Sequence, residues 1–380
     1  MPEILGWRNA PDREAMVHRA AQLLTEGQLV GFPTETIYGI AAAAWLPEAV
    51  ERLAATKGRQ EQKPMAMAIR GPHEVHLWVP HLGKMGWRLA RRCMPGPITL
   101  VCDVPDDNEF RDRLSASVRR WVCPNGTLGL RAPAHEAIQQ VLQLLPGPVL
   151  LTSANPSGEA EATDAVQVAR TFENHLALII DDGPSPLGRA STVVRIQGDS
   201  WKVIREGVLH AGDLQALAAC LILFVCTGNT CRSPLAEVLC KKMLAEKLQC
   251  TINELPGKGF LVQSAGLAAW PGDRATPEAM EMARELGVDI QGHVSQPVTR
   301  ELAFQSDYLV AMTQTHVQTL RARFSDEAPP PTFLCSDGAD LPDPIGCDLT
   351  VYRECAQALQ KHLEPWVEKF LAGDCAWIPM

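Results

Sequence analysis

The chain has 380 residues, of which 46% are hydrophobic and 21% are charged, so it is long enough for two globular domains and too apolar to be disordered. Its formal net charge of −9 argues against a protein that coats nucleic acid with a general positive surface. Twelve cysteines occur without a CxxC pair or a zinc-finger spacing, so we expect reduced thiols, no metal site and a cytoplasmic location.

The sequence gives no sign of a leader or of a membrane segment. The first ten residues, MPEILGWRNA, lack a basic region followed by an apolar block. The longest apolar run, near 216–226, is shorter than the roughly 20 residues that a membrane helix needs. We predict that this run is the end of a linker helix leading into a buried strand, and that the protein has no membrane partner.

The first half of the chain, residues 1–212, alternates strand-like and helix-like patterns. One predicted helix carries apolar residues at Ile138, Val141 and Leu142, which is a helical spacing. The predicted strands are 28–33, 65–69, 97–102, 148–152, 176–180 and 191–196, and the predicted helices are 11–26, 47–56, 84–92 and 134–145.

Polar strings stand at the ends of these predicted strands and helices. Taken singly, each fits a helix cap or a turn, and the chain has no Walker motif. The strings include P-T-E-T-I-Y-G at 33–39, K-G-R at 57–59, T-S-A-N-P-S-G at 152–158 and S-T-V-V at 191–194. Together they make residues 13–208 resemble the YrdC-like domain of threonylcarbamoyl-AMP synthases.

The resemblance implies a twisted mixed-sheet α/β fold and a defined reaction. Such a domain condenses L-threonine, bicarbonate and ATP into L-threonylcarbamoyladenylate and pyrophosphate. Magnesium would accompany the ATP phosphates. The product would feed threonylcarbamoyladenosine modification of tRNA through a downstream transferase, so tRNA is an indirect partner. The alternative is a non-catalytic RNA-binding module.

The same resemblance assigns site residues in this half. It implies an ATP site at Lys57, Arg59, Thr127, Asn155, Thr163 and Arg205, and a threonine site at Thr34, Tyr38, Arg131, Ser153 and Ser191. The three cations of the ATP site would offset triphosphate and carbamate charge. Two residues depart from the family pattern: Gln60 replaces a common proline and should loosen a loop, and Ala68 replaces a histidine, which removes one threonine contact.

The second half, residues 220–380, opens with a strand pattern, L-I-L-F-V at 221–225. The apolar run is typical of a strand in a parallel sheet, and Pro234 after it fits the first turn of a helix. A second helix is predicted from Thr276 as its cap to Gly287 after its end, and a strand at 307–313. This order predicts a doubly wound parallel sheet.

The string C-T-G-N-T-C-R-S-P, at 226–234, joins the first strand to the first helix of this half. Backbone N–H groups and the helix dipole at such a place bind phosphate and favour the thiolate form of a cysteine. Gly228 should let the backbone curl, and Arg232 offers a planar fork to two phosphoryl oxygens. Ser233 can donate to the thiolate of Cys226. The pattern predicts phosphoryl transfer to sulfur, followed by hydrolysis of a phosphocysteine.

Such chemistry needs a general acid for the leaving group, and Asp343 in L-P-D-P-I-G is the candidate. With this loop, residues 221 to about 370 resemble the low-molecular-weight protein tyrosine phosphatase family. The resemblance implies Cys226 as nucleophile, Arg232 as clamp and Asp343 as acid, without a cofactor. It also implies a protective disulfide between Cys231 and Cys226. The predicted phosphate-binding loop comprises Thr227, Gly228, Asn229, Thr230, Cys231 and Ser233.

Two features bear on the phosphoprotein substrate. Thr230 stands where the arginine-phosphatase branch carries threonine, and the D-P-I-G loop lacks the aromatic residues that usually wall a phosphotyrosine ring. Trp270 stands where tyrosine phosphatases place an aromatic wall, and its face could stack on a phenol or a guanidinium. We predict a phosphoarginine phosphatase, with phosphotyrosine as the alternative. A non-catalytic regulator in either half is a further alternative.

Overall fold

The computed structural model describes residues 1–60, 63–104, 114–324, 328–335 and 338–373. The chain divides into two compact units, Met1–Leu214 and Gln215–Met380. Helix α9, Ala211–Ala218, contains the division. It is followed by a buried strand, which confirms the predicted passage from linker helix to strand.

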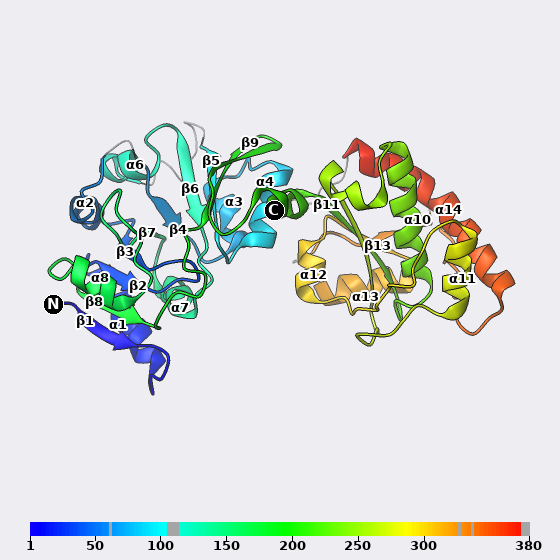
Figure 1. Ribbon diagram of the computed structural model, residues 1–380, viewed down its shortest axis with the longest axis horizontal. Helices are drawn as coiled ribbons and strands as arrows, with labels where there is room; N and C mark the ends of the chain where they lie inside the picture. Colours follow the sequence, from blue (N-terminus) through cyan, green and yellow to red (C-terminus); the bar gives the residue numbers. More distant parts are fainter. Residues whose placement is uncertain (61–62, 105–113, 325–327, 336–337, 374–380) are drawn as a thin grey trace. The chain divides into compact units, whose positions relative to one another are not determined.

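The first unit is built on a mixed sheet (Figure 1). Among the described residues, ten strands run in the order β1-β8-β2-β3-β7-β4-β6-β5-β9-β10. Parallel and antiparallel pairs alternate irregularly along this order, as expected for a twisted mixed sheet. The strands are β1 Glu3–Gly6, β2 Val30–Phe32, β3 Gly39–Ala43, β4 Ala66–Ala68, β5 Ile98–Asp103, β6 Thr127–Arg131, β7 Val149–Ser153, β8 Leu178–Asp181, β9 Thr192–Gln197 and β10 Ser200–Arg205.

Helices surround this sheet. Helices α1 and α7 pack on each other and share an apolar core with β2, β7 and β8, because α7 places Ile138, Val141 and Leu142 on one buried face. The helices are α1 Arg13–Thr25, α2 Pro47–Thr56, α3 Val75–Trp78, α4 Lys84–Cys93, α6 Ala116–Val122, α7 Glu136–Leu144 and α8 Ala165–Thr171, with a short 3-10 turn at Pro72–Glu74. The sequence predictions of α1, α2, α4 and α7 are confirmed.

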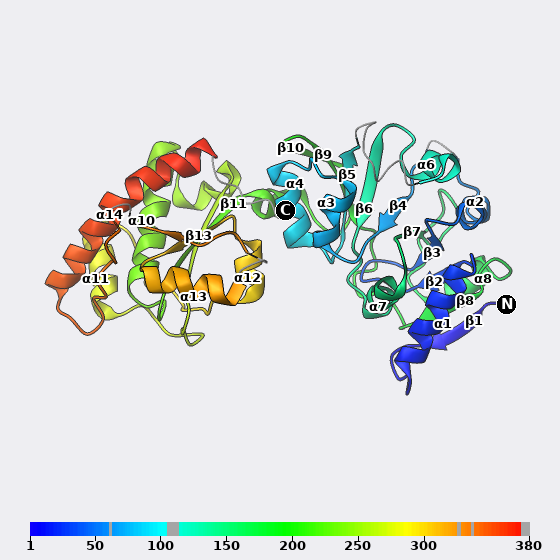
Figure 2. The same ribbon diagram turned by 180° about the vertical axis from the view of Figure 1, so that it is seen from behind.

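The second unit is a parallel sheet with helices on both faces, as the sequence predicted (Figures 1 and 2). The described strands run in the order β12-β11-β13-β14, and every pair is parallel. They are β11 Cys220–Cys226, β12 Phe260–Gly266, β13 Tyr308–Ala311 and β14 Thr332–Phe333. The helices are α10 Arg232–Lys247, α11 Pro277–Glu285, α12 Arg300–Gln305, α13 Gln314–Phe324 and α14 Leu349–Ala372, with 3-10 turns at Ile252–Glu254 and Pro256–Lys258.

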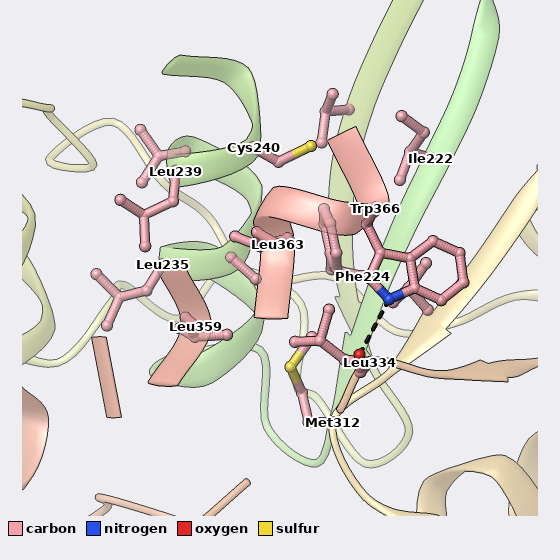
Figure 3. Close-up of a cluster of buried hydrophobic side chains, with 14 of the residues drawn as sticks. Ile222, Phe224, Leu235, Leu239, Cys240, Met312, Leu334, Leu359, Leu363 and Trp366 are labelled. Atoms are coloured by element: carbon pink, nitrogen blue, oxygen red, sulfur yellow. Dashed lines mark hydrogen bonds between the residues drawn. The ribbon is translucent and has the colours of Figure 1, made fainter. Parts of the chain in front are cut away.

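Strand β11 separates two apolar cores. Ile222 and Phe224 join the core formed with α10, α11 and α14, whereas Leu223 and Val225 join the core with α12 and α13. Successive side chains of a strand point to opposite faces, so a continuous apolar run is what a strand covered on both faces requires. In the larger core the indole of Trp366 donates to the carbonyl of Leu334 at 3.0 Å (Figure 3). This two-faced packing fixes the carboxyl end of β11, where Cys226 lies.

No helix among the described residues is both long and apolar enough to cross a membrane.

Candidate active sites

The cysteine loop of the second unit lies between the end of β11 at Cys226 and the start of α10 at Arg232. The thiol is buried, and a backbone N–H and a hydroxyl group lie within hydrogen-bond distance of it. The backbone N–H of Asn229 lies 3.2 Å from Cys226 Sγ, and Ser233 Oγ lies 3.0 Å from the same sulfur. Both contacts stabilise negative charge on sulfur and on a group bound above it.

The left-handed residue in this loop is Asn229, with φ 57°, and not Gly228. The expectation that Gly228 makes the tight turn is therefore wrong. Asparagine tolerates this conformation because its short amide can bond locally. The amide of Asn229 is fully buried and donates to Ser233 Oγ at 3.0 Å and to Ser264 Oγ at 2.9 Å. The side chain thus fixes the turn that aims the backbone N–H at sulfur.

A glycine is required beside the loop, at Gly266 on β12. Gly266 pairs with Cys226 across the sheet, and a Cβ at this position would lie 2.5 Å from the carbonyl oxygen of Thr227. No ordinary side chain fits that distance. Gly266 therefore lets β12 approach the backbone of the cysteine loop.

Arg232 and Asp343, the residues predicted as clamp and acid, form an ion pair. One terminal nitrogen of Arg232 lies 2.5 Å from Asp343 Oδ2, and the other donates to the carbonyl of Leu341 at 3.2 Å. The guanidinium is buried, whereas the carboxylate is partly exposed. The Leu341 contact fixes the orientation of the fork, and the acid loop reaches the cysteine loop through this ion pair.

The thiol of Cys231 points to a different group of polar atoms. It lies 3.2 Å from the hydroxyl of Tyr352 and 3.6 Å from Thr276 Oγ1, and the two hydroxyls lie 2.9 Å apart. Burial raises the pKa of Tyr352, so this hydroxyl stays protonated. Both Cys226 and Cys231 are free thiols in this structure, so the expected disulfide stays a prediction.

His316 is a neighbour of the loop that the sequence did not reveal. Its Nε2 lies 3.0 Å from Thr227 Oγ1, and the side chain is buried on α13. Burial, and secondarily the charge of Arg232, lowers the pKa of His316 from 6.5 to about 4. The imidazole is therefore neutral at neutral pH. A single histidine outside every motif carries no sequence signal of this kind.

The first unit holds a cavity of about 400 Å³ over one face of its sheet. Alternate residues of neighbouring strands line it, such as Thr99 and Val101 of β5 and Thr127 and Gly129 of β6, because a period of two places them on one face. Eight of the residues predicted for ATP and threonine line the cavity: Thr34, Tyr38, Arg59, Thr127, Arg131, Ser153, Ser191 and Arg205.

Arg131, at the end of β6, is held by the T-E-T string. Its Nη2 lies 2.6 Å from Thr36 Oγ1 and 2.8 Å from Glu35 Oε1, and it also reaches Thr34 Oγ1 at 3.3 Å. Its Nε is buried and has no hydrogen-bond partner among the described residues. The guanidinium thus has one edge fixed by the protein and an unpaired N–H donor for an anion.

Lys57 and Arg59 follow α2 and bring positive charge to the site. The Lys57 amine donates to the carbonyl of Ser153 and lies 3.4 Å from Ser153 Oγ. Burial, and secondarily the charge of Arg59, lowers the pKa of Lys57 from 10.5 to about 7. Burial, then Arg205, lowers the pKa of Arg59. Buried cations that repel one another mark a site that favours an added anion.

Family models match both units. The model Sua5_yciO_yrdC, described as telomere recombination, matches residues 22–207, and the model for low molecular weight phosphotyrosine protein phosphatase matches residues 221–374. A putative threonylcarbamoyl-AMP synthase of Mycobacterium tuberculosis is 30% identical over 209 residues, which are 54% of this chain and 91% of that protein. A protein-arginine-phosphatase of Bacillus subtilis is 36% identical over 146 residues, which are 37% of this chain and 91% of that protein.

The chain belongs to both families.

A longer architecture exists among the relatives of the YrdC-like unit. The chain spans 57% of the length of the curated threonylcarbamoyl-AMP synthases from Pyrococcus abyssi and Bacillus subtilis that it also matches. A solved structure of Sua5 from P. abyssi aligns with a TM-score of 0.51 at 24% identity, covering 80% of this chain and 95% of that one. At this identity the likeness shows the fold alone.

Three residues predicted for the ATP site of the YrdC-like unit, Lys57, Asn155 and Thr163, are not part of the cavity lining. Asn155 donates to the carbonyl of Glu159 at 2.6 Å, while its buried Oδ1 has no partner among the described residues. That oxygen is a free acceptor for a hydroxyl or amine. Thr163 Oγ1 accepts only a long contact, 3.4 Å, from Gln167 among the contacts described.

Tyr38 of the YrdC-like unit has its hydroxyl engaged within the protein. It donates to the carbonyl of Gly183 at 2.8 Å and accepts from the backbone N–H of Asp182 at 3.1 Å. Burial raises the pKa of this phenol. The Tyr38 hydroxyl is therefore occupied by Gly183 and Asp182 within the protein.

The two departures from the family pattern lie near this cavity. Ala68 of β4 pairs with Arg131 of β6, so the missing histidine side chain would have stood next to the fixed guanidinium. The loop that Gln60 was expected to loosen includes residues 61–62, which lie outside the described residues. Sequence reasoning also missed Glu161, which lines the cavity and is its carboxylate nearest Lys57 and Arg205.

The phosphatase unit places Thr230 and Trp270 as follows. Thr230 Oγ1 lies 3.6 Å from Cys231 Sγ, and the Thr230 carbonyl accepts from the backbone N–H of Thr276 at 3.0 Å. Trp270 is 79% exposed and stands in the loop after β12. Neither side chain is engaged in the apolar cores, so both are free to meet a substrate.

Proposed function

We propose that the chain is a bifunctional enzyme whose two domains, residues 1–212 and 220–380, each hold a complete active site. The boundaries are those that the sequence predicts, and the two compact units support them. The two families support the reaction classes, a nucleotidyltransferase and a phosphatase. The cytoplasmic location expected from the sequence stays a prediction.

The first domain is proposed to make L-threonylcarbamoyladenylate. The observation that carries this is the convergence of Arg59, Arg131 and Arg205 on one cavity, with Lys57 behind it. The threonine amine and bicarbonate form a carbamate with loss of water. A carbamate oxygen then attacks the α-phosphorus, and the bond to pyrophosphate breaks. The domain contributes positioning and charge neutralisation, because the described lining brings three guanidinium groups to the reacting anions.

Each predicted residue is assigned to one part of the substrates according to its charge and position. Arg131 would bind the threonine carboxylate through its unpaired Nε–H, and Ser153 and Ser191 would contact the carbamate. Lys57, Arg59 and Arg205 would neutralise the triphosphate, and the Oδ1 of Asn155 would accept from the adenosine. Glu161 would supply a carboxylate ligand for a magnesium ion that accompanies the triphosphate, since Mg²⁺ takes few protein ligands in such sites. The product would reach tRNA through a downstream transferase.

ATP–pyrophosphate exchange tests this activity. We expect exchange that requires both threonine and bicarbonate. Exchange that ignores threonine, or RNA binding without exchange, would reject the synthase in favour of a different nucleotidyltransferase or an RNA-binding module.

The second domain is proposed to hydrolyse phosphoproteins through a phosphocysteine. The observation that carries this is the pair of donors on Cys226 Sγ with Arg232 at the same loop. The thiolate attacks phosphorus as the bond to the substrate nitrogen or oxygen breaks, and Asp343 donates a proton to that leaving atom. Water then attacks phosphorus, Asp343 takes its proton, the S–P bond breaks and the thiolate returns.

The ion pair between Arg232 and Asp343 sets the order of events. A phosphoryl dianion binds the Arg232 fork bidentately and so competes with Asp343 for it. Binding of substrate would thereby release the carboxyl group to act as an acid above the leaving atom. The other loop residues, Thr227, Gly228, Asn229, Thr230 and Cys231, would present backbone N–H groups to the remaining phosphoryl oxygens.

We propose phosphoarginine as the substrate of this domain. The likeness to a protein-arginine-phosphatase and the presence of Thr230 support it. The exposed face of Trp270 also fits phosphotyrosine, which is the second candidate. Side-by-side kinetics with a phosphoarginine peptide and a phosphotyrosine peptide decide between them. Higher kcat/KM on phosphotyrosine would reject the arginine assignment.

A further inference from the structure

The segment His293–Gln296 contacts the cysteine loop at Asn229. His293 Nε2 lies 2.7 Å from the carbonyl oxygen of Asn229, and the backbone N–H of Gln296 donates to Asn229 Oδ1 at 2.9 Å. Asn229 is the left-handed residue whose N–H points at Cys226 Sγ. The segment is therefore attached to the residue that shapes the cysteine loop.

The same segment holds the loop that carries Trp270, through Ser295. Ser295 Oγ donates to the carbonyl of Trp270 at 2.5 Å and accepts from the N–H of Asp273 at 3.0 Å. Its backbone N–H donates to the carbonyl of Asp273 at 2.8 Å, and its carbonyl accepts from the N–H of Gly272 at 3.0 Å. The hydroxyl and the backbone of one residue thus hold three positions of this loop.

Packing cannot hold Trp270, because its side chain is 79% exposed whereas Ser295 is 2% exposed. An indole in that position is located by its backbone, and the backbone is located by hydrogen bonds to a buried residue. Buried hydrogen bonds are worth more than exposed ones because water does not compete for them. The position of the Trp270 backbone, from which the indole projects, therefore depends on Ser295.

We propose that Ser295 is a positioning residue for substrate recognition, which sets the distance between the Trp270 face and the phosphate-binding loop. Ser295 does not touch substrate. By holding the Trp270 loop, Ser295 lets the enzyme recognise a planar group, a guanidinium or a phenol, that is bonded to the phosphoryl group. This inference rests on the proposed phosphatase activity and adds to it a residue in none of the motifs.

A double-mutant cycle tests the inference. Ser295→Ala and Trp270→Ala should each raise KM for the better phosphopeptide about 2- to 10-fold, the range of one stacking contact, with kcat changed less than about 2-fold. The double variant should be no worse than Trp270→Ala, because the serine acts through the indole. Inorganic phosphate should bind only the cysteine loop, so its inhibition constant should be unchanged in the two single variants and in the double variant.

The matched control is Ser306→Ala, another buried serine of the same unit, whose hydroxyl donates to the carbonyl of Leu302 at 2.7 Å. It should leave KM unchanged and so remove general loss of stability as an explanation. If Ser295→Ala does not fold, Ser295→Cys keeps the volume and weakens the hydrogen bonds, with the same expected changes.

Two results would overturn the inference. One is additivity, in which Ser295→Ala raises KM as much without Trp270 as with it. The other is weaker inhibition by phosphate, which would place the effect in the cysteine loop.

Amide hydrogen exchange tests the role of Ser295 without any turnover. The N–H of Asp273 should exchange faster in Ser295→Ala and not in Ser306→Ala, because only the first variant removes its acceptor. Equal exchange in the two variants would contradict the inference. Wild-type protein that turns over neither peptide would reject the phosphatase proposal, and the exchange result would still decide whether Ser295 holds this loop.

Discussion

At the scale of single residues, the shape of the cysteine loop depends on hydrogen-bond partners that Asn229 gains from α10 and β12. Cys226, Ser233 and Arg232 lie seven positions apart at most, so a strand–loop–helix must bring them together. Asn229 takes the turn conformation expected of Gly228 because its amide gains two buried partners, Ser233 on α10 and Ser264 on β12. Such partners are visible only once the strands are paired, which is why the sequence pointed to glycine.

His316 gives a prediction for stability at acid pH. Its pKa is about 4 in the folded protein against 6.5 ordinarily, so between these pH values the unfolded chain binds a proton that the folded protein does not. The free energy of unfolding therefore falls as pH drops from 6.5 toward 4. His316→Gln should reduce this loss by about 1–2 kcal/mol, allowing for solvent near the ring. Denaturant unfolding at pH 7 and 4.5 measures it, and an equal loss in both proteins would contradict the prediction.

Lys57 gives a prediction for ligand binding. Its pKa of about 7 leaves the amine mostly neutral at pH 8, and bound triphosphate would favour the charged form. ATP binding at pH 8 should therefore take up close to one proton, and Lys57→Met should lose that uptake. Calorimetry in buffers of different ionisation enthalpy measures it. Equal uptake by the two proteins would assign the proton to another group.

Elements with strong local signals were predicted, whereas strands with weak local signals were missed. Helix α2 was predicted to the residue because Pro47 fits its first turn and an apolar face follows. Strand β3, GIAAA, and strand β6, TLGLR, were missed because glycine and alanine rarely mark strands. Their neighbours in the sheet, β7 and β5, supply the pairing that holds them. The cavity of the YrdC-like unit is built on these strands, so its shape was not predictable.

The acid loop between β14 and α14 gives a prediction at this scale. Asp343→Asn keeps the volume and removes the proton, so turnover of a substrate with a poor leaving group should fall about 100- to 1,000-fold. A substrate with a good leaving group should lose much less. The control is Asp340→Asn in the same loop, whose carboxylate accepts from the N–H of Gln314 at 2.7 Å. Equal losses on both substrates would reject Asp343 as the acid.

At the scale of the whole molecule, the two units have separate cores and separate sites. The described core clusters each draw on residues of one unit. The sequence predicted this organisation because each half carries its own complete set of motifs.

If the two sites act independently, a variant of one site should lose only the activity of that site. Cys226→Ser should abolish phosphatase turnover and leave threonylcarbamoyladenylate formation within about 2-fold, because each site is built from residues of its own unit and sites without shared partners act additively. Lys57→Met should do the reverse. Parallel assays of both activities on each full-length variant measure this. Loss of both activities in either variant would reveal an obligate coupling between the domains.

Helix α9 has a practical consequence for anyone who wishes to separate the two enzymes genetically. The chain divides between Leu214 and Gln215, halfway along a helix that runs from Ala211 to Ala218. A gene cut at that point would leave half of the helix on each product, where it would fray. The cut would also place the buried Leu214 at a new chain end. Two gene fragments that overlap would give each product the intact helix. The first fragment would end at Ala219 and the second would start at His210.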